Sequence, residues 1–293
     1  MDEKLRRVLE RIARDKTSGA SQLARIVCAA LRQRLANSPS PRTAELRTAA
    51  RLLLSMQPEM APVARLAIEC RRAANSAAAF GRFPEVVAAF EARLTTAPTA
   101  IAAHFESLLS GHGNIRVAMF SYSGTAIGAV VRARRRIRGV FCAEGRPNFE
   151  GRRAARELSL AGLRVTLLTD PAWLDSLGKA AMVVVGADAV TESAFLNKVG
   201  TSAAVCSARR LRIPVYVLAD STKFLPSTAA RRLLKVRNQA GPISEVWSGA
   251  PLCVHIENPY LAWTSWQEGV HWLSEAGIKR ATRSRQLSYQ VFR

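Results

Sequence analysis

Residues 139–170 read GVFCAEGRPNFEGRRAARELSLAGLRVTLLTD. Two apolar runs, GVFCAE at 139–144 and RVTLLTD at 164–170, flank a stretch at 151–162 whose composition is typical of a helix. Continuous apolar runs of this length predict strands that are buried on both faces of a parallel sheet. The stretch therefore predicts a strand–helix–strand unit with a right-handed crossover.

The same alternation continues on both sides of this unit. Further apolar runs are VAMFSYS from 117, AMVVVGAD from 181 and PVYVLAD from 214, and FLNKVGTSAAVCSARRLR at 195–212 is predicted to be helical. Strands that alternate with helices in this way predict a doubly wound, Rossmann-like parallel sheet.

The first 112 residues contain only helical patterns. Apolar residues from Leu23 to Leu35 recur at helical spacing, and Thr43 is placed to cap a second helix. Three more helical stretches follow at 62–75, 84–95 and 99–109, before GHGN at 111–114 breaks the pattern. We therefore expect an α/β protein with an N-terminal all-helical domain at 1–112 and a Rossmann-like, ligand-binding domain at 113–293.

The composition excludes a disordered chain, because 48% hydrophobic residues among 293 can form a sizeable core. Lys+Arg number 43 and Asp+Glu 22, which gives a net charge of +21. Only seven of the basic residues are lysines, and a chain rich in Ala and Arg indicates codon bias rather than a nucleic-acid partner. The densest basic cluster, at 132–138, has no interleaved aromatic residue. We expect it to be a solvated helix end, and we do not expect nucleic-acid binding.

The five cysteines are scattered and form no C-x-x-C pair, which disfavours a disulfide framework or a zinc ribbon. Cys206 is predicted to pack in the core on an apolar helix face. The sequence contains no run of about 18 apolar residues without a charge, so it predicts no membrane span. The N-terminus is charged throughout, unlike a secretory signal. We expect a cytoplasmic protein that does not contact a membrane.

Ligands of an open parallel sheet bind beyond the carboxyl ends of its strands. The residues predicted at these ends mix carboxylates, cations and hydroxyl groups: Ser121, Tyr122, Ser123, Gly124, Thr125, Glu144, Arg146, Pro147, Asp170, Asp188, Asp220, Ser221 and Lys223. This mixture favours a small, anionic, hydroxylated ligand such as a sugar phosphate. Asp170 and Asp220 have an equal alternative as caps of the helices that follow them.

The sequence contains neither G-x-G-x-x-G nor a P-loop pattern, and its four histidines lack metal-ligand spacing. We therefore expect neither a cofactor nor a metal ion.

Four motifs, taken in order, resemble a known family. They are E-x-R-P at 144–147 with Gly151 after it, GADAV at 186–190, NKVGT at 197–201 and YVLADSTKF at 216–224. Together they are similar to the family shared by the α, β and δ regulatory subunits of translation initiation factor 2B, the ribose 1,5-bisphosphate isomerases and the methylthioribose 1-phosphate isomerases. The resemblance covers roughly 115–225, and TSGASQLAR at 17–25 resembles the family's N-terminal glycine loop. It implies a helical domain on a Rossmann-like domain, with homo-oligomers, dimeric or larger, built through the latter.

The resemblance also implies site residues. Asp188 matches the aspartate that, with a cysteine, carries the proton or hydride chemistry converting an aldose phosphate to a ketose phosphate. The substrate-binding positions that it implies are Gly19, Ala20, Glu144, Arg146, Asn197, Lys198 and Lys223.

Several positions depart from the family pattern. The loop at 120–125 has no cysteine, and Ser121 or Ser123 takes its place, depending on the register. A hydroxyl is a poor substitute for a thiol in acid/base chemistry near neutral pH. Two phosphate-binding arginines of the family correspond to Ser18 and Gln57, and NPYLAWTS at 258–265 lacks the family's aspartate and last proline.

These departures favour a binding or regulatory protein, similar to the subunits of initiation factor 2B. Its ligand would be a sugar phosphate or a nucleoside monophosphate held in the cleft between the two domains. The alternative is an aldose–ketose isomerase, an intramolecular oxidoreductase, that uses Asp188 with Ser121, Ser123 or water. A third hypothesis is an interaction protein whose basic face meets RNA or an acidic partner.

Overall fold

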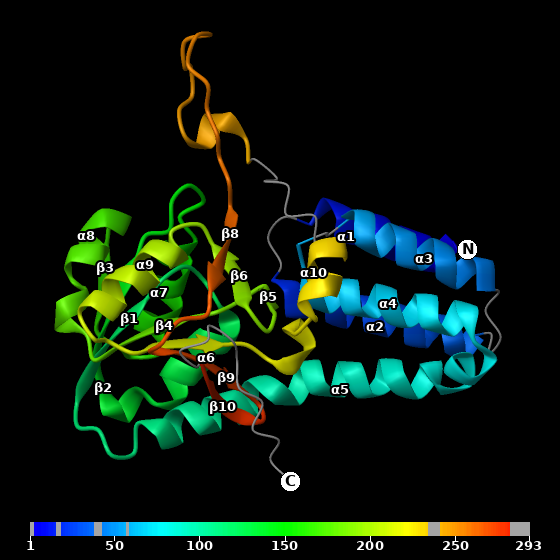
Figure 1. The fold of residues 1–293 in the computed structure, drawn as a ribbon, viewed down its shortest axis with the longest axis horizontal. Coiled ribbons are helices and arrows are strands. Elements are labelled where there is room, and N and C mark those ends of the chain that lie inside the picture. Colours follow the sequence, from blue (N-terminus) through cyan, green and yellow to red (C-terminus); the bar gives the residue numbers. More distant parts are fainter. Residues whose placement is uncertain (1–2, 16–18, 38–42, 57–58, 234–240, 282–293) are drawn as a thin grey trace. The chain divides into compact units, whose positions relative to one another are not determined.

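The computed structural model describes residues 3–15, 19–37, 43–56, 59–233 and 241–281 (Figure 1). The chain forms two compact units, one of Met1–Ala97 with Ser221–Lys235 and one of Pro98–Asp220 with Val236–Arg293. Among the described residues, no helix is long and apolar enough to cross a membrane.

The first unit is helical. Its elements are α1 (Glu3–Arg14), α2 (Ala20–Asn37), α3 (Thr43–Met56), α4 (Ala61–Asn75), the first part of α5 (Ala77–Leu108), a 3₁₀ turn η3 (Ser221–Lys223) and α10 (Ser227–Leu233). Leu23, Val27 and Leu31 of α2 are buried in its core, as their spacing predicts. The expected N-terminal all-helical region is therefore present.

One helix replaces two that the sequence predicts at 84–95 and 99–109. Helix α5 continues through Pro84 and Pro98, although a proline inside a helix costs about 3 kcal/mol or more. Its buried face also continues, from Phe83 to Leu94 in the core of the first unit and from Ile101 to Phe105 in that of the second. Each such buried side chain contributes about 1.5–3 kcal/mol, so the continuous apolar face outweighs the prolines. The boundary expected at 112 falls after this helix, whereas the two compact units part within it.

The second unit contains a seven-stranded sheet in the order β10-β9-β7-β4-β1-β2-β3. All neighbouring strands are parallel except the antiparallel pair β9 and β10. The strands are β1 (Ile115–Met119), β2 (Ile137–Ala143), β3 (Val165–Leu168), β4 (Met182–Val185), β7 (Val215–Leu218), β9 (Val270–Ser274) and β10 (Gly277–Arg280). The five strands predicted from apolar runs are all present in a mostly parallel, Rossmann-like sheet. Helices α6 (Gly124–Arg132), α7 (Glu150–Leu160), α8 (Asp170–Asp175) and α9 (Thr201–Arg210) connect them.

A second, antiparallel sheet is formed by β5 (Ala189–Val190), β6 (Ala194–Lys198) and β8 (Leu261–Ser265). The prediction of one helix over 195–212 is therefore wrong for its first residues, because Phe195 and Leu196 pair with β8 instead. Gly200 has a φ of 95° and lies so close to Phe120 that a Cβ there would be 2.8 Å from the ring. The backbone conformation at Gly200 ends the strand segment, and α9 starts at Thr201. Cys206 is exposed on α9, so the prediction that it belongs to the core is also wrong.

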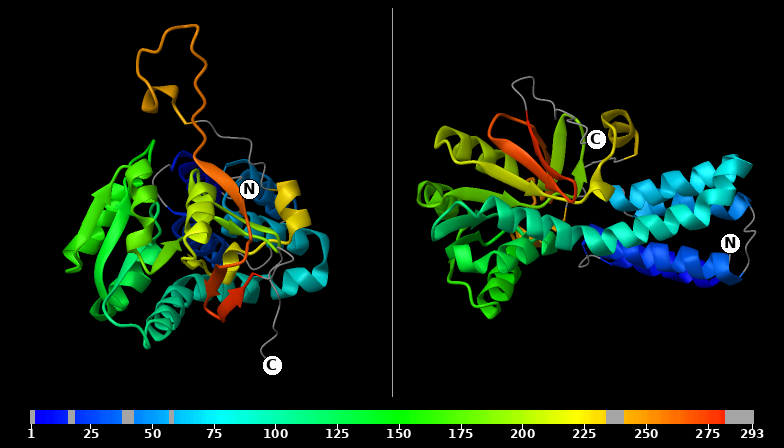
Figure 2. Two further views of the ribbon diagram at one scale, coloured as in Figure 1. Left: turned by 60° about the vertical axis from the view of Figure 1, so that its left-hand side comes forward. Right: turned by 90° about the horizontal axis from the view of Figure 1, so that it is seen from below.

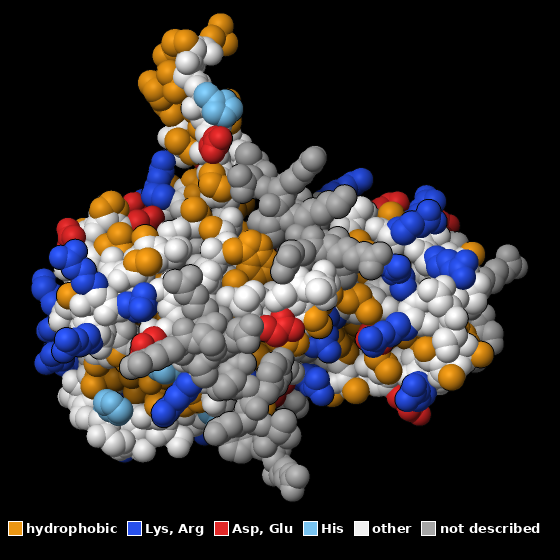
Figure 3. Space-filling model, viewed as in Figure 1, with side chains coloured by type: hydrophobic (Ala, Val, Ile, Leu, Met, Phe, Trp, Pro, Cys, Tyr) orange, Lys and Arg blue, Asp and Glu red, His pale blue; other side chains and the backbone are white. Residues whose placement is uncertain are grey.

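The basic cluster at 132–138 lies where α6 runs through a 3₁₀ turn into β2, and its five arginines are exposed. Arg132 is paired with Glu106 at 2.7 Å. On the face shown in Figure 3, Lys and Arg side chains are dispersed among apolar and neutral groups. This placement agrees with the expected solvated helix end.

Candidate functional site

The order of the parallel strands reverses between β1 and β4, which lie side by side. Ligands of such sheets bind outside the carboxyl ends at this point. The two loops there pack tightly, since a Cβ at Gly186 would lie 2.6 Å from the Oγ of Ser123. Ser121, Ser123 and Asp188 thus belong to the loops that flank the switch point, as expected.

The two candidate serines have different surroundings. The Oγ of Ser123 accepts the N–H of Ala126 at 3.3 Å and caps α6. Ser121 has a φ of 65°, which is uncommon outside glycine, and its hydroxyl donates to Oε1 of Glu150 at 3.3 Å. Ser121 therefore belongs to a polar network, whereas Ser123 stabilises a helix end.

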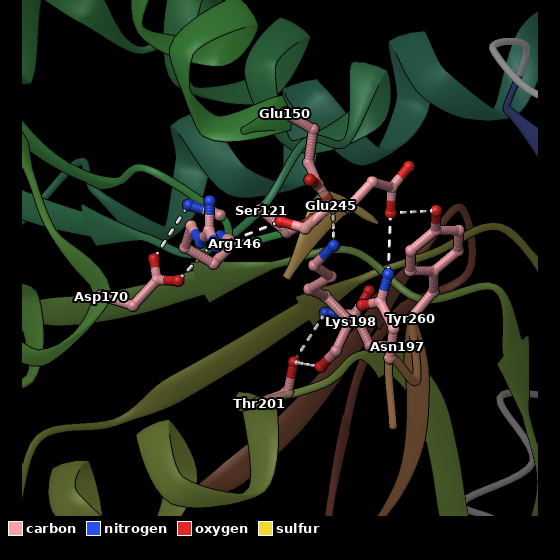
Figure 4. A network of polar contacts seen from close by, with 11 residues as sticks. Ser121, Arg146, Glu150, Asp170, Asn197, Lys198, Thr201, Glu245 and Tyr260 are labelled. Carbon is pink, nitrogen blue, oxygen red and sulfur yellow. Dashed lines mark hydrogen bonds and ion pairs between the residues drawn. The ribbon is translucent and has the colours of Figure 1, made fainter. Parts of the chain in front are cut away.

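The network centres on Lys198, whose side chain is only 3% exposed. Its Nζ lies 2.7 Å from Oε1 of Glu150, the first residue of α7, and 5.4 Å from the ring centre of Tyr260 (Figure 4). The other carboxylate oxygen of Glu150, Oε2, is buried and has no hydrogen-bond partner among the described residues. The sequence does not single out Glu150, because nothing local to α7 shows that it meets a lysine 48 residues further along the chain.

Asn197 is buried next to Lys198 and holds the turn between β6 and α9. Its Nδ2 donates to Oγ1 of Thr201 at 3.1 Å, and the Thr201 hydroxyl donates to the carbonyl of Lys198 at 2.6 Å. Asn197 therefore orients the backbone that carries the lysine.

The E-x-R-P loop is held from the next strand. The carboxylate of Asp170 accepts the N–H groups of Gly145 and Arg146, both at 2.8 Å, so its side chain binds this loop rather than capping α8. The peptide between Arg146 and Pro147 is cis. Gly151 lies against β2 so closely that a Cβ would be 1.8 Å from the carbonyl oxygen of Ala143, which only glycine permits.

The side chains of this loop point to other partners. Arg146 is exposed, donates to the carbonyl of Glu245 at 3.1 Å and lies 4.9 Å from the ring centre of Phe149. Glu144 pairs with Arg152 at 3.5 Å. The structure thus brings Arg146 to the rim of the network and pairs Glu144 with a surface arginine.

Glu245 is a site residue that the sequence does not reveal, since it lies 99 residues from Arg146 and outside the four family motifs. Its carboxylate accepts the hydroxyl of Tyr260 and, at 2.8 Å, the amide of Asn258. Burial, together with this bond to Glu245, raises the pKa of Tyr260 to about 12. Tyr260 therefore keeps its proton and holds the 3₁₀ turn η4 (Ile243–Glu245) beside Lys198.

Asp188 lies in a loop at the switch point, and the other remaining candidates belong to the first unit or lie outside the described residues. Asp188 is half-buried after β4, and its N–H donates to the carbonyl of Leu196 at 2.8 Å. Gly19, Ala20 and Lys223 belong to the first unit, at the start of α2 and in η3. Ser18 and Gln57 lie outside the described residues.

Three of the five cysteines are buried and two are exposed. Cys28, Cys70 and Cys142 are buried, and burial raises the pKa of each to about 12. Cys206 and Cys253 are exposed, on α9 and between η4 and β8. No group of three or more His, Cys, Asp or Glu side chains is arranged to hold a metal ion in the described ranges.

The sequence profile of the initiation factor 2 subunit family matches residues 5–244, most of the chain. The chain belongs to this family. The resemblance carried by the four motifs is thereby confirmed.

The relatives include sugar-phosphate isomerases and initiation-factor-like proteins. A ribose 1,5-bisphosphate isomerase of Archaeoglobus fulgidus is 36% identical over 101 residues, which are 34% of this chain and 32% of the relative. A putative translation initiation factor eIF-2B subunit 2-like protein of Pyrococcus horikoshii is 32% identical over 110 residues, 36% of this chain and 40% of the relative. The matched segments thus span about a third to two fifths of these relatives.

Solved structures share the whole fold. The translation initiation factor eIF-2B of Pyrococcus horikoshii OT3 covers 98% of this chain and 100% of its own, with a TM-score of 0.75 and 25% identity. The 5-methylthioribose 1-phosphate isomerase of the same organism covers 96% of this chain and 86% of its own, with a TM-score of 0.69 and 19% identity. The fold is thus common to factor subunits and sugar-phosphate isomerases.

Proposed function

We propose that the protein binds a phosphorylated sugar or a nucleoside monophosphate beyond the carboxyl ends of β1 and β4, as a binding or regulatory protein. The observation that carries this proposal is the contact of a buried cation, a carboxylate and a hydroxyl, on Lys198, Glu150 and Ser121, at the switch point. Polar groups that meet in this way on separate elements are typical of a ligand site. Asp188, Asn197 and Arg146 would complete it, with Glu144 as a further proposed contact.

The surroundings of the serines support a binding role over isomerisation. Ser123 is committed to capping α6, and Ser121 to a hydrogen bond with Glu150. Of the described thiols, Cys142 lies closest in sequence to the E-x-R-P loop, and it is buried with a pKa of about 12. Neither hydroxyl nor thiol is thus set up as an acid/base group near neutral pH.

Calorimetric titration with ribose 5-phosphate and adenosine monophosphate tests this proposal. We expect Lys198→Met to weaken binding at least tenfold, because the variant removes the buried cation and leaves Glu150 unpaired. Lys179→Met, on an exposed 3₁₀ turn, is the control. Circular dichroism checks that Lys198→Met is folded. The double variant Lys198→Met/Glu150→Gln also removes the unpaired carboxylate, so weak binding by a folded double variant shows the loss of the cation itself. Equal affinity of Lys198→Met and the wild type, or no binding by the wild type, would contradict the proposal.

The second candidate is an aldose–ketose sugar-phosphate isomerase that uses Asp188 as its acid/base group. The identity to the Archaeoglobus fulgidus enzyme and the position of Asp188 directly after β4 favour it. Proton NMR in deuterated water with ribose 1,5-bisphosphate distinguishes the two candidates. Turnover that is lost in Asp188→Asn would establish the isomerase and overturn the binding role.

We also propose that the protein is a homodimer or larger homo-oligomer in the cytoplasm, where its scattered cysteines would stay reduced. Residues 241–260, here called the apolar arm, project from β8 as a loop (Figure 2). Large apolar side chains are exposed along it: Ile243, Val246, Trp247, Leu252 and Val254 (Figure 3). Exposed apolar patches of this kind mark association surfaces.

A second copy of the chain suits the apolar arm by charge. The apolar arm holds two glutamates, Glu245 and Glu257, and neither lysine nor arginine, in a chain of net charge +21. An acidic, apolar segment is complementary to the basic remainder of another copy. One structural neighbour is described as a tetrameric eIF2B complex from C. thermophilum.

A further inference from the structure

We propose that Glu150 makes the site select hydroxyl groups over a second phosphate next to Lys198. This inference rests on the proposed ligand site and narrows its ligand to a singly phosphorylated compound whose hydroxyls face the Lys198–Glu150 pair.

The first step is the charge of the pair. Nζ of Lys198 and Oε1 of Glu150 are 2.7 Å apart, and the two side chains are 3% and 24% exposed. A buried, paired lysine no longer presents a free positive charge to an incoming dianion. A phosphate placed against Nζ would also meet the negative carboxylate, with little water to screen the repulsion.

The second step is the set of open hydrogen-bonding positions. Oε1 of Glu150 accepts hydrogen bonds from both Lys198 and the hydroxyl of Ser121, whereas Oε2 is buried and receives no donor from the part of the chain that the structure describes. A buried acceptor of this kind is stabilised by a ligand group that donates a hydrogen bond. A phosphate dianion cannot donate one, but a sugar hydroxyl can.

The third step is the packing next to Oε2. Gly145 has a φ of 78°, and a Cβ on it would lie 3.1 Å from the backbone nitrogen of Gly151 and 3.4 Å from Oε2 of Glu150. A side chain at position 145 would therefore crowd this oxygen, and with glycine there no such side chain competes with a donor group of a ligand. The Lys198 ammonium can donate further hydrogen bonds, and Oε2 of Glu150 can accept one. Together they are complementary to two neighbouring hydroxyls, such as the diol of a ribose.

The wild-type protein provides the first measurement. Calorimetry should give affinities for ribose 5-phosphate and ribose 1,5-bisphosphate that agree within about threefold, while 2-deoxyribose 5-phosphate binds at least tenfold more weakly. A tenfold preference for the bisphosphate, or equal binding of the deoxy compound, would overturn the inference.

The second measurement uses Glu150→Gln. This variant removes the negative charge that pairs with Lys198 and keeps a side chain of nearly the same shape. The variant should bind inorganic phosphate and ribose 1,5-bisphosphate at least tenfold more tightly than the wild type, as followed by ³¹P NMR. Glu157→Gln, on the same helix but paired with surface Arg153, should not change these affinities. The gain should vanish in Glu150→Gln/Lys198→Met.

The outcomes separate the two proposals. If the wild type binds ribose 5-phosphate and Glu150→Gln gains nothing for phosphate, the role of Glu150 is overturned and the binding function stands. If neither the wild type nor the variants bind ribose 5-phosphate, but Glu150→Gln binds inorganic phosphate more tightly than the wild type, the binding function fails and the charge role of Glu150 stands.

Discussion

Ser121 and Ser123 lie two residues apart, yet only Ser121 contacts the polar network. Ser123 caps α6 through its hydroxyl. We expect Ser123→Ala to lower the free energy of unfolding by about 1 kcal/mol, the usual value of a lost helix cap. Urea denaturation measures this, with Ser159→Ala on the exposed face of α7 as the control. An unchanged stability would show that the cap does not contribute.

Ser121→Ala should have the opposite profile. It removes the hydrogen bond to Glu150 but no helix cap, so we expect ligand affinity to fall severalfold while the urea midpoint changes little. Titration of both serine variants with ribose 5-phosphate compares them directly. A larger loss of affinity in Ser123→Ala would reverse their assigned roles.

Asp170 holds the E-x-R-P loop through two backbone N–H groups. An asparagine presents one acceptor oxygen in place of two, so one N–H loses its partner. We expect Asp170→Asn to lower the free energy of unfolding by about 1–3 kcal/mol, as for an unsatisfied hydrogen-bonding group. Asp175→Asn, at the exposed end of α8, is the control for urea denaturation. Equal effects of the two variants would contradict this role of Asp170.

At the scale of elements, β9 carries a pH-sensitive side chain. The ring centres of His271 and Tyr216 are 5.2 Å apart, and Nδ1 of His271 is buried with no hydrogen-bond partner in the described ranges. Burial first, and then the charge of Arg280, lower the pKa of His271 below its ordinary 6.5. Because the unfolded chain takes up the proton more readily, this residue contributes stability above about pH 6.5 that is lost as the pH falls.

Thermal unfolding between pH 7.5 and 5 checks this expectation. The melting temperature of the wild type should fall more steeply below pH 6.5 than that of His271→Gln. His112→Gln, at an exposed turn, should follow the wild type. Parallel curves for the wild type and His271→Gln would contradict a lowered pKa.

At the scale of the whole molecule, the apolar arm is the surface through which we propose association. Trp247→Ser/Leu252→Ser should convert the wild-type dimer or larger oligomer to a monomer, because both side chains are exposed and apolar. Light scattering coupled to size exclusion measures the mass. Leu160→Ser, which changes an exposed apolar residue of α7, should leave it unchanged. A monomeric wild type, or an unchanged mass of the double variant, would contradict the proposed interface.

Much of the fold was predictable from the sequence, because the spacing of apolar residues indicates whether a segment is a helix or a strand and which of its faces is buried. The five apolar runs became the strands β1, β2, β3, β4 and β7, and their order placed Ser121 and Asp188 at the switch point. The four motifs identified the family, because their residue types and order can be compared along the chain without knowledge of the fold. The sequence by itself therefore determined the architecture and the edge of the sheet where a ligand is expected.

The tertiary structure alone decided what each of these side chains contacts. Helix α5 passes through Pro98 because a continuous buried face outweighs the local cost, which no short window of sequence weighs. The pairing of Lys198 with Glu150, and of Arg146 with the carbonyl of Glu245, joins residues distant in the chain. Charge neutralisation and unsatisfied acceptors depend on distances of a few ångströms across the fold, so they became visible only when the strands and loops were placed in space.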